Sequence, residues 1–399
     1  MEGKLARLLR GVCAAIGLLS SFAGAAQEDP ELALLLKEAA ERNPELLAAR
    51  REAEAAASRV ESAAALDDPM LEAGLVNVPA QSFSLRREAA RRDAQASAGG
   101  ANEVLNRVQR DVKAAYLDLW LADESLRLTE SNLRVLEQLR SIAESRYSVG
   151  QSTQADVFKA QTQLSRMQEE RLKLGRERPV LEAELNRAAG RDGSTAVKPR
   201  APQVREADLR LEALRAAARA GRPQLLAQQR LVDRSATQLD LAKKDYYPDF
   251  DLRFSYGQRD NFQDMRREDL ISFTVAINLP VWGKNKREPR VAEAESMRSQ
   301  AAAMYQARLN EIDSMLRQQV AAAGQALRSV RLYEGALIPQ ARLTADASLS
   351  AYRVGRVDFF SLLDSRMTVF NAEIGHAAAV VAYNKALAEV EFLTGAALF

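Results

Sequence analysis

Apolar and small residues recur every seven positions through long stretches of this chain. One series begins at Leu105 and continues at seven-residue intervals to Leu133, and a second, interleaved with it, runs from Val108 to Ala143. A further seam extends from Val157 to Leu185. Apolar residues at positions a and d of a heptad are typical of coiled-coil helices. Glycine and proline are confined to a few junctions, so the pattern predicts very long helices.

A short glycine-containing segment separates the two seams. Gly150 can end the first helix, and Ser152 or Thr153 can cap the second. Two helices joined so tightly must pack antiparallel, which predicts a coiled-coil hairpin. The same construction returns around Gly355, where Asp358 can cap a helix whose apolar positions are Leu363, Phe370, Ile374 and Val381.

The two halves of the chain contain similar sequence motifs. The two turns share a Tyr-x-Val-Gly sequence, and Gly355 follows Gly150 at an offset of 355 − 150 = 205. Nearer the front, Pro44 and Pro223 open similar segments, at an offset of 223 − 44 = 179. Anchors with fixed spacing in both halves predict a duplicated structural unit.

Two segments in the second half have the alternation of β-strands. Apolar and polar residues alternate over 249–256 and again over 271–279, with several aromatic residues among them. Period-two alternation over about ten residues is typical of membrane β-strands. A soluble hairpin would have the same pattern.

The first residues have the composition of a secretory signal peptide. Lys4, Arg7 and Arg10 precede an apolar run that ends in small residues at Ala25 and Ala26. We expect cleavage there. A signal anchor would need about 20 apolar residues, more than this run supplies.

Cleavage changes the composition of the mature chain. It removes Cys13, the one cysteine, and leaves 53 basic against 53 acidic residues, since residues 1–26 hold three of the 56 Lys and Arg and one of the 54 Asp and Glu. Without thiols there are no disulfides, and a neutral chain lacks the basic footprint of a nucleic-acid-binding protein. No later segment is apolar over the roughly 18 residues that a spanning helix needs, so membrane contact is expected through strands.

Residues with catalytic chemistry are scarce. His376 is the one histidine and lies among alanines in a predicted helix, so a packing role is favoured over a ligand or a base. The eight methionines are scattered on helical faces, which fits core packing better than a soft-metal relay. Neither an enzymatic activity nor a cofactor or bound metal is expected.

The two turns, here called the tips, are the candidate functional site. A docking surface for a partner and a helix stop inherited through duplication explain their similarity equally well. The candidate docking residues are Tyr147, Val149, Gly150, Gln151, Ser152, Thr153, Tyr352, Val354, Gly355, Arg356, Val357 and Asp358.

Three carboxylates near the tips form a candidate acidic ring for a pore. In a symmetric assembly Asp156, Asp358 and Asp364 would each be repeated around the axis and favour cations. For Asp156 and Asp358 the alternative is stronger, because a carboxylate in the first turn of a helix also suits the helix dipole.

Taken together, these motifs resemble the TolC-type outer-membrane efflux channels over nearly the whole mature chain. The resemblance rests on both tips and on short proline-containing motifs in each half, namely Asn43-Pro44, Arg222-Pro223, Asp68-Pro69-Met70, Tyr247-Pro248-Asp249 and Leu279-Pro280-Val281-Trp282-Gly283-Lys284. The segment 68–79 looks most like the branch that serves heavy-metal efflux pumps.

The resemblance implies a mainly α protein of the outer membrane. Its expected parts are a long antiparallel coiled-coil helical barrel in the periplasm and a small membrane β-barrel cap shared by a homotrimer. The chain would be the passive conduit of a tripartite efflux pump, with metal cations as one candidate substrate. A periplasmic adaptor, or membrane fusion protein, is expected to meet the tips and connect them to an inner-membrane pump.

The repeat sets the expected boundaries. A signal peptide occupies 1–26, and a first repeat occupies 27–190, with a shortened β-hairpin near 70–85 and a tip near residue 150. An equatorial linker follows at 191–206, and a second repeat at 207–399 holds a β-hairpin at 249–279 and a tip near residue 355.

The first β-hairpin is expected to be truncated. The offset between the repeats grows from 179 to 205, so the first repeat is shorter by the difference, 205 − 179 = 26. That leaves too little chain to cross a bilayer core of about 30 Å twice. An impaired channel is therefore one alternative function. Another is a periplasmic coiled-coil scaffold or adaptor without a pore, although an adaptor would carry a β domain beside a single hairpin.

Overall fold

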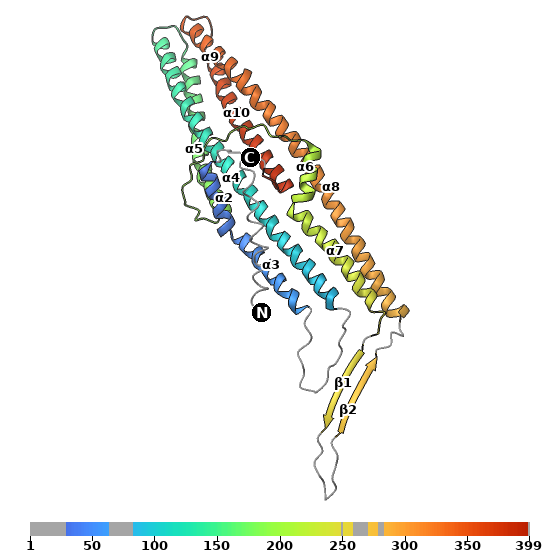
Figure 1. Cartoon of the computed structure of the whole chain (residues 1–399). Helices are drawn as coiled ribbons and strands as arrows, with labels where there is room; N and C mark the ends of the chain where they lie inside the picture. Colours follow the sequence, from blue (N-terminus) through green and yellow to red (C-terminus); the bar gives the residue numbers. More distant parts are fainter. Residues whose placement is uncertain (1–28, 64–82, 249, 258–269, 278–282, 398–399) are drawn as a thin grey trace.

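The structure, a computed structural model, describes residues 29–63, 83–248, 250–257, 270–277 and 283–397. It is an elongated helical molecule with two helical tips at one end and a β-hairpin at the other (Figure 1). The expected signal peptide, residues 1–26, lies outside the described residues.

Helices form almost all of the described chain. The first half holds α2 (Pro30–Arg42), α3 (Pro44–Ser62), α4 (Phe83–Ser148) and α5 (Gln154–Ala189). The second half holds α6 (Leu211–Gly221), α7 (Pro223–Lys244), the strands β1 (Phe250–Gly257) and β2 (Leu270–Ile277), the π-helix η2 (Gly283–Arg287), α8 (Glu288–Leu332), the π-helix η3 (Tyr333–Leu337), α9 (Ile338–Arg353) and α10 (Phe359–Thr394).

The duplication is visible in the helix boundaries. Helix α4 spans 83–148, and the continuous run from α8 through η3 to α9 spans 288–353, so both ends match at an offset of 205. Helices α5 and α10 both have 36 residues and also match at an offset of 205. Each half is therefore the same helical unit, with α4 about 100 Å long at 1.5 Å per residue.

The two halves cap their second helices differently. The Asn43 side chain accepts hydrogen bonds from the backbone of Glu45 (2.9 Å) and Leu46 (3.2 Å) at the start of α3. Arg222 stands at the matching position before α7, is almost fully buried, pairs with Glu103 at 3.1 Å and lies 4.7 Å from the ring of Phe392. Asn43 thus caps its helix and also donates to the Ala188 carbonyl at 3.0 Å, whereas the Arg222 side chain makes no cap hydrogen bond and contacts other helices.

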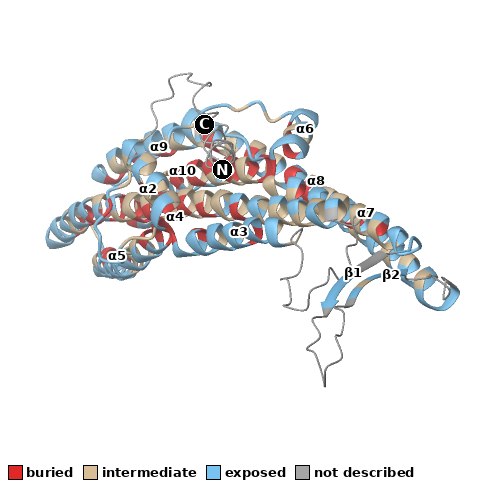
Figure 2. Ribbon diagram, turned by 60° about the horizontal axis from the view of Figure 1, so that its bottom comes forward, coloured by how far each residue is buried: buried red, intermediate tan, exposed pale blue. Residues whose placement is uncertain are grey.

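The heptad positions form the core. Val112, Leu119, Leu136 and Ala143 of α4 are buried, as are Ala160, Leu164 and Leu185 of α5. Figure 2 shows the buried residues on the facing sides of α4, α5 and α10, with the outer faces exposed. Small residues on these seams let the helices approach closely.

Two glycines mark a close contact that both halves contain. Gly190 and Gly395 end α5 and α10 in the left-handed conformation, with φ of 69° and 68°. A Cβ at Gly190 would lie 2.9 Å from the backbone of Arg42, and a Cβ at Gly395 would lie 2.6 Å from the carbonyl oxygen of Gly221. Each hairpin therefore packs its end against the junction of the two short helices of its own repeat.

Residues 190–210 join the halves without helix or strand. Val197 is fully buried among α2, α4 and α5 residues. The Tyr116 hydroxyl accepts a hydrogen bond from the Arg200 backbone at 2.9 Å, and the Tyr383 hydroxyl donates to the Arg205 carbonyl at 2.5 Å. Two tyrosines from different helices thus hold this connection against the helical body.

The strands β1 and β2 form an antiparallel hairpin in which Phe254 faces Phe273 and Tyr256 faces Ile271. The corresponding connection in the first half is shorter: the passage from α3 to α4 spans 63–82, whereas the passage from α7 to η2 spans 245–282. The shortened hairpin expected near 70–85 lies mostly in 64–82, outside the described residues. The prediction of a hairpin is wrong for its last residues, because Phe83 to Leu85 already belong to α4.

Among the described residues, none of the helices contains an apolar stretch of the length that spanning a bilayer requires.

Candidate functional site

The first tip is a tight turn built by Gly150. Its backbone N–H donates to the Tyr147 carbonyl at 3.0 Å, and that of Gln151 donates to the Arg146 carbonyl at 2.8 Å. This pair of bonds closes the end of α4 and requires the left-handed conformation, which Gly150 adopts with φ of 74°. Thr153 then starts α5 through a reciprocal capping box with Asp156.

The second tip repeats this geometry at the offset of 205. Gly355, with φ of 73°, donates to the Tyr352 carbonyl at 3.0 Å, and Arg356 donates to the Ala351 carbonyl at 2.9 Å. Asp358 caps α10 by accepting a hydrogen bond from the Ser361 backbone at 2.8 Å. The shared glycine is thus explained by the turn that both tips make.

The shared tyrosine has a different role in each tip. Tyr147 is 47% exposed, whereas Tyr352 is 3% exposed. The ring of Tyr352 meets the ring of Phe359 edge to face, with centroids 5.6 Å apart. Tyr352 is among the predicted docking residues, but it packs inside the tip and leaves almost no surface for a partner.

Arg146 connects the two tips. Its guanidinium lies 4.8 Å from the Tyr352 ring centre and donates to the carbonyls of Tyr352 and, at 2.9 Å, of Arg353. It also donates to the Gln151 carbonyl of its own tip at 3.2 Å. We call these contacts the arginine clasp. Ala351 occupies the matching position of the second repeat, so the clasp exists once per chain.

The remaining predicted docking residues are mostly accessible. Val149 and Val354 are 66% and 69% exposed. The residues Gly150, Gln151, Thr153, Gly355, Arg356 and Asp358 are also exposed, and Ser152 and Val357 are partly buried. The tips therefore present two exposed valines beside polar groups.

Sequence reasoning missed two aromatic residues next to the tips. Phe158 of α5 and Phe360 of α10 are each 58% exposed, and the ammonium group of Lys159 lies 5.8 Å from the Phe360 ring centre. Neither residue has an aromatic counterpart at an offset of 205, where Leu363 and Ala155 stand, so the repeat gave no signal for them. Their place in the first turns of α5 and α10 was the available clue.

The three carboxylates of the candidate acidic ring have different surroundings. Asp156 accepts hydrogen bonds from Ser152 at 2.9 Å and from the Thr153 backbone at 3.2 Å. Hydrogen bonds from Ser361 lower the pKa of Asp358 below its ordinary value. Asp364 is exposed, and no described residue pairs with its carboxylate. Two of the three are thus engaged in helix capping.

The one histidine also has a local partner. His376 Nε2 of α10 lies 2.9 Å from Glu334 Oε1 of η3. Within the described ranges, no group of three or more His, Cys, Asp and Glu side chains could hold a metal ion.

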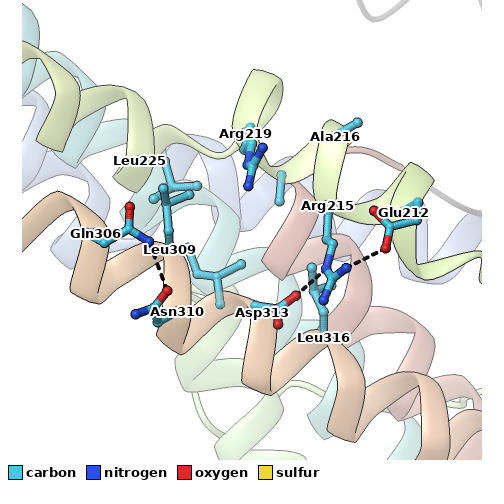
Figure 3. Close-up of a pocket in the computed structure, with 12 residues that line it drawn as sticks. Glu212, Arg215, Ala216, Arg219, Leu225, Gln306, Leu309, Asn310, Asp313 and Leu316 are labelled. Atoms are coloured by element: carbon cyan, nitrogen blue, oxygen red, sulfur yellow. Dashed lines mark hydrogen bonds and ion pairs between the residues drawn. The ribbon is translucent and has the colours of Figure 1, made fainter.

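A pocket between α6 and α8 is lined by ion-paired residues. Arg215 of α6 reaches Asp313 of α8 and Glu212 of its own helix (Figure 3). Hydrogen bonds from Arg215 and from Arg317 lower the pKa of Asp313 to about 2. These charges neutralise one another across the pocket, which indicates that they attach the short helix α6 to the long helix α8.

The β-hairpin has one apolar and one polar face. On the first, Phe254, Tyr256, Ile271, Phe273 and Val275 are each at least 50% exposed. Aromatic and aliphatic residues oppose one another across the strands of this face, whereas Ser255 pairs with Ser272 on the other face. An exposed apolar surface of this kind marks a site of contact with another protein or with a membrane.

Residues 214–396 match the family model described as "Outer membrane efflux protein". The whole fold is similar to that of outer-membrane proteins of known structure. A membrane protein from Pseudomonas aeruginosa is 20% identical, with a TM-score of 0.79 and coverage of 92% of this chain and 94% of that one. VceC from Vibrio cholerae is 16% identical, with a TM-score of 0.80 and coverage of 93% and 98%.

The channel-forming protein CusC is 14% identical, with a TM-score of 0.80 and coverage of 95% and 96%. Similarity at this level of identity establishes the fold and does not separate one branch from another. No curated protein matches this chain significantly in sequence. Residues 214–396 thus match the predicted family, and the predicted mainly helical, duplicated fold is confirmed.

Proposed function

We propose that this chain, whose second half is that of an outer membrane efflux protein, is the outer-membrane channel component of a tripartite efflux pump. It acts as a passive conduit from the periplasm to the exterior. The helical body stands in the periplasm, and the hairpin of β1 and β2 enters the outer membrane. The observation that carries this proposal is the exposed apolar face of the hairpin.

The dimensions of the hairpin suit a bilayer. The exposed Tyr246 and Tyr247 precede β1, and Tyr256, 54% exposed, lies near its other end. From Tyr247 to Tyr256 an extended chain covers about 30 Å, close to the thickness of a hydrocarbon core. Aromatic residues at both borders of an apolar band are typical of membrane strands.

A single hairpin is not sufficient in lipid. Each of its two strands has an unpaired edge, and backbone groups at such an edge find no water inside a membrane. Other copies of the chain must therefore complete the sheet. The resemblance to trimeric channels supports a homotrimer in which each protomer contributes strands.

The tips support docking of a periplasmic adaptor that leads to an inner-membrane pump. Val149 and Val354 stand on the ends of rigid helices, so an adaptor can bind without ordering a loop first. Val149, Gly150, Gln151, Thr153 and the corresponding residues of the second tip are the proposed contacts. Phe158 and Phe360 extend this surface along α5 and α10.

Metal cations are one substrate class for the conduit. Asp364 is the strongest candidate for an acidic ring, because Asp156 and Asp358 already serve as helix caps. In a trimer its carboxylate would occur three times around the pore axis. In single-channel recordings, the Asp364→Asn channel should show a lower preference for cations than the Asp358→Asn channel. Equal cation preferences of the two variants would contradict an acidic ring at Asp364.

The short first connection favours a second candidate, a channel with impaired closure. The first half passes from α3 to α4 within 63–82, whereas the equivalent passage in the second half takes up 245–282. Inserting the missing strand and return, with the sequence of the second half, would test this. Because α4 begins at Phe83, the insertion belongs immediately before that residue. If the unmodified chain forms as many conducting trimers, the idea of impairment is wrong.

The hairpin itself gives a sharp test with a matched control. Phe254→Asp with Phe273→Asp places two carboxylates on the apolar face, and Ser255→Asp with Ser272→Asp places two on the other face at the neighbouring pair. Charged residues on a lipid-facing strand cost up to about 2 kcal/mol each. We expect only the first variant to be lost from the outer-membrane fraction. Equal distribution of both variants would favour the soluble scaffold instead.

A further inference from the structure

A strongly basic surface lies where the helices meet the β-hairpin. The segments 243–248 and 283–290 together hold six Lys and Arg against two acidic residues, Asp245 and Glu288. We call five of these positions the basic collar, namely Lys243, Lys244, Lys284, Lys286 and Arg287. They come from the end of α7 and from η2, immediately before and after the hairpin.

Most of the positive charge of the collar is not neutralised by the part of the chain that the structure describes. Lys243, Lys284 and Lys286 are exposed, and no carboxylate of the described residues pairs with them. Arg287 donates to the backbone carbonyl of Asp245 at 2.6 Å. The carboxylate of Asp245 forms an ion pair with Arg290 at 3.1 Å. Lys243, Lys284 and Lys286 thus carry positive charge that no ion pair among the described residues neutralises.

The collar lies next to the aromatic border of the hairpin. Lys243 and Lys244 directly precede Asp245 and the exposed Tyr246 and Tyr247, and the ammonium group of Lys244 lies 5.1 Å from the Tyr247 ring centre. The adjacent ends of α3 and α4, on the same side of the molecule in Figure 1, add the exposed Arg59, Arg86 and Arg87. Basic residues therefore stand at this end of the helical body in both halves, and one of them, Arg87, pairs with Glu61 at 3.9 Å.

We infer that the basic collar binds the anionic phosphate headgroups of phospholipids in the leaflet that faces the helices. This inference rests on the proposed function, which places the hairpin in that membrane. Lys and Arg beside an anionic surface strengthen membrane binding about fivefold per charge, and their long side chains can reach headgroups while the stems cover apolar surface. The collar would fix the depth of the hairpin by holding its base at the headgroup layer.

The test compares lipid binding by two charge variants of the full chain. The collar variant is Lys243→Gln, Lys284→Gln and Lys286→Gln. The control is Lys37→Gln, Lys173→Gln and Lys198→Gln, which removes the same charge from exposed positions on the helical body and the linker. Both proteins and the unmodified chain are purified in detergent, and the binding of phosphatidylglycerol and of phosphatidylethanolamine is measured by native mass spectrometry.

We expect the unmodified chain and the control to prefer phosphatidylglycerol. The collar variant should bind it on the order of 100-fold more weakly, about fivefold for each of three charges, with little change for phosphatidylethanolamine. Raising the salt concentration should remove the preference of the unmodified chain, because salt screens exposed charges. Inorganic phosphate at matched concentration should not displace the lipid.

The outcomes separate the two proposals. If the chain is found in the outer membrane and conducts, but the collar and control variants bind phosphatidylglycerol alike, the collar inference is wrong and the function stands. Displacement by inorganic phosphate alone would make the collar a phosphate site and overturn lipid binding. A chain that is absent from the outer membrane contradicts the proposed function itself.

Discussion

Removal of the arginine clasp should loosen the second tip without unfolding the protein. Arg146→Ala deletes the donors to the carbonyls of Tyr352 and Arg353 and the contact with the Tyr352 ring. Arg146 is only half-buried, so we use the low ends of the usual ranges. One charged hydrogen bond at about 1.5 kcal/mol and one cation–π contact at about 0.5 kcal/mol sum to about 2 kcal/mol.

Native-state hydrogen exchange measures this effect locally. The amides of Gly355 and Arg356 donate to carbonyls in the last turn of α9, and they exchange only when the tip opens. A loss of about 2 kcal/mol corresponds to about 30-fold faster exchange at these amides. Amides in the middle of α10 should keep their protection, because the core there does not include Arg146.

Two further variants control this experiment. Arg140→Ala removes an exposed ion pair with Glu144 earlier in α4 and should cost less than about 0.5 kcal/mol. Arg146→Lys keeps the charge but loses the planar fork and should fall between the two. If Arg146→Ala leaves exchange at Gly355 and Arg356 within twofold of the unmodified chain, packing of Tyr352 on Phe359 holds the tips and the role of the clasp is refuted.

Three other predictions concern the repeat, an ion pair and the docking surface. Gly190→Ala and Gly395→Ala should each lower the free energy of unfolding by at least about 1–2 kcal/mol, because both positions have positive φ and no room for a Cβ. Urea titration measures this loss. The control Gly175→Ala, in open space on α5, should not be destabilising. Asp313→Asn should lower the urea midpoint at pH 7. Since the folded pKa of about 2 lies below the ordinary 3.8, the stabilisation is present above about pH 4 and lost toward pH 2, so a difference that persists at pH 2 contradicts this role. Replacing both Gly150 and Gly355 with valine should abolish crosslinking to the adaptor while trimers persist, and undiminished crosslinking would count against docking at the tips.

The helical part of the fold could be predicted because its packing is periodic. The heptad positions of α4 and α5, such as Val112, Leu119 and Leu164, are buried as their spacing requires. The glycines at the tips fixed the ends of the helices, since a left-handed residue is needed there. Sequence periodicity and turn chemistry act locally, so a single sequence was sufficient to find them.

The candidate site was harder to predict because its contacts join segments that lie far apart in the sequence, as Arg146 and Tyr352 do. The repeat made Tyr147 and Tyr352 look equivalent, yet one is exposed and the other buried. Tyr352 contacts Phe359 and Arg146, whereas the matching positions of the other repeat hold Gln154 and Ala351. Duplication predicts shared turns correctly, but it says nothing about contacts between the two copies.

The start of α4 illustrates a second limit. The shortened hairpin was expected to extend to residue 85, but Phe83 to Leu85 are helical. A few residues of Phe, Ser and Leu fit either structure, and continuity with a very long helix decides in favour of the helix. The same continuity places Glu288 at the matching start of α8.

The central claim is that this chain forms a trimeric channel in the outer membrane, and one measurement tests it most directly. Outer membranes are isolated from cells that express the full chain, and the protein is analysed by gel electrophoresis with and without heating. We expect a heat-resistant trimer in the outer-membrane fraction. A heat-sensitive monomer recovered from the soluble periplasm would contradict the claim.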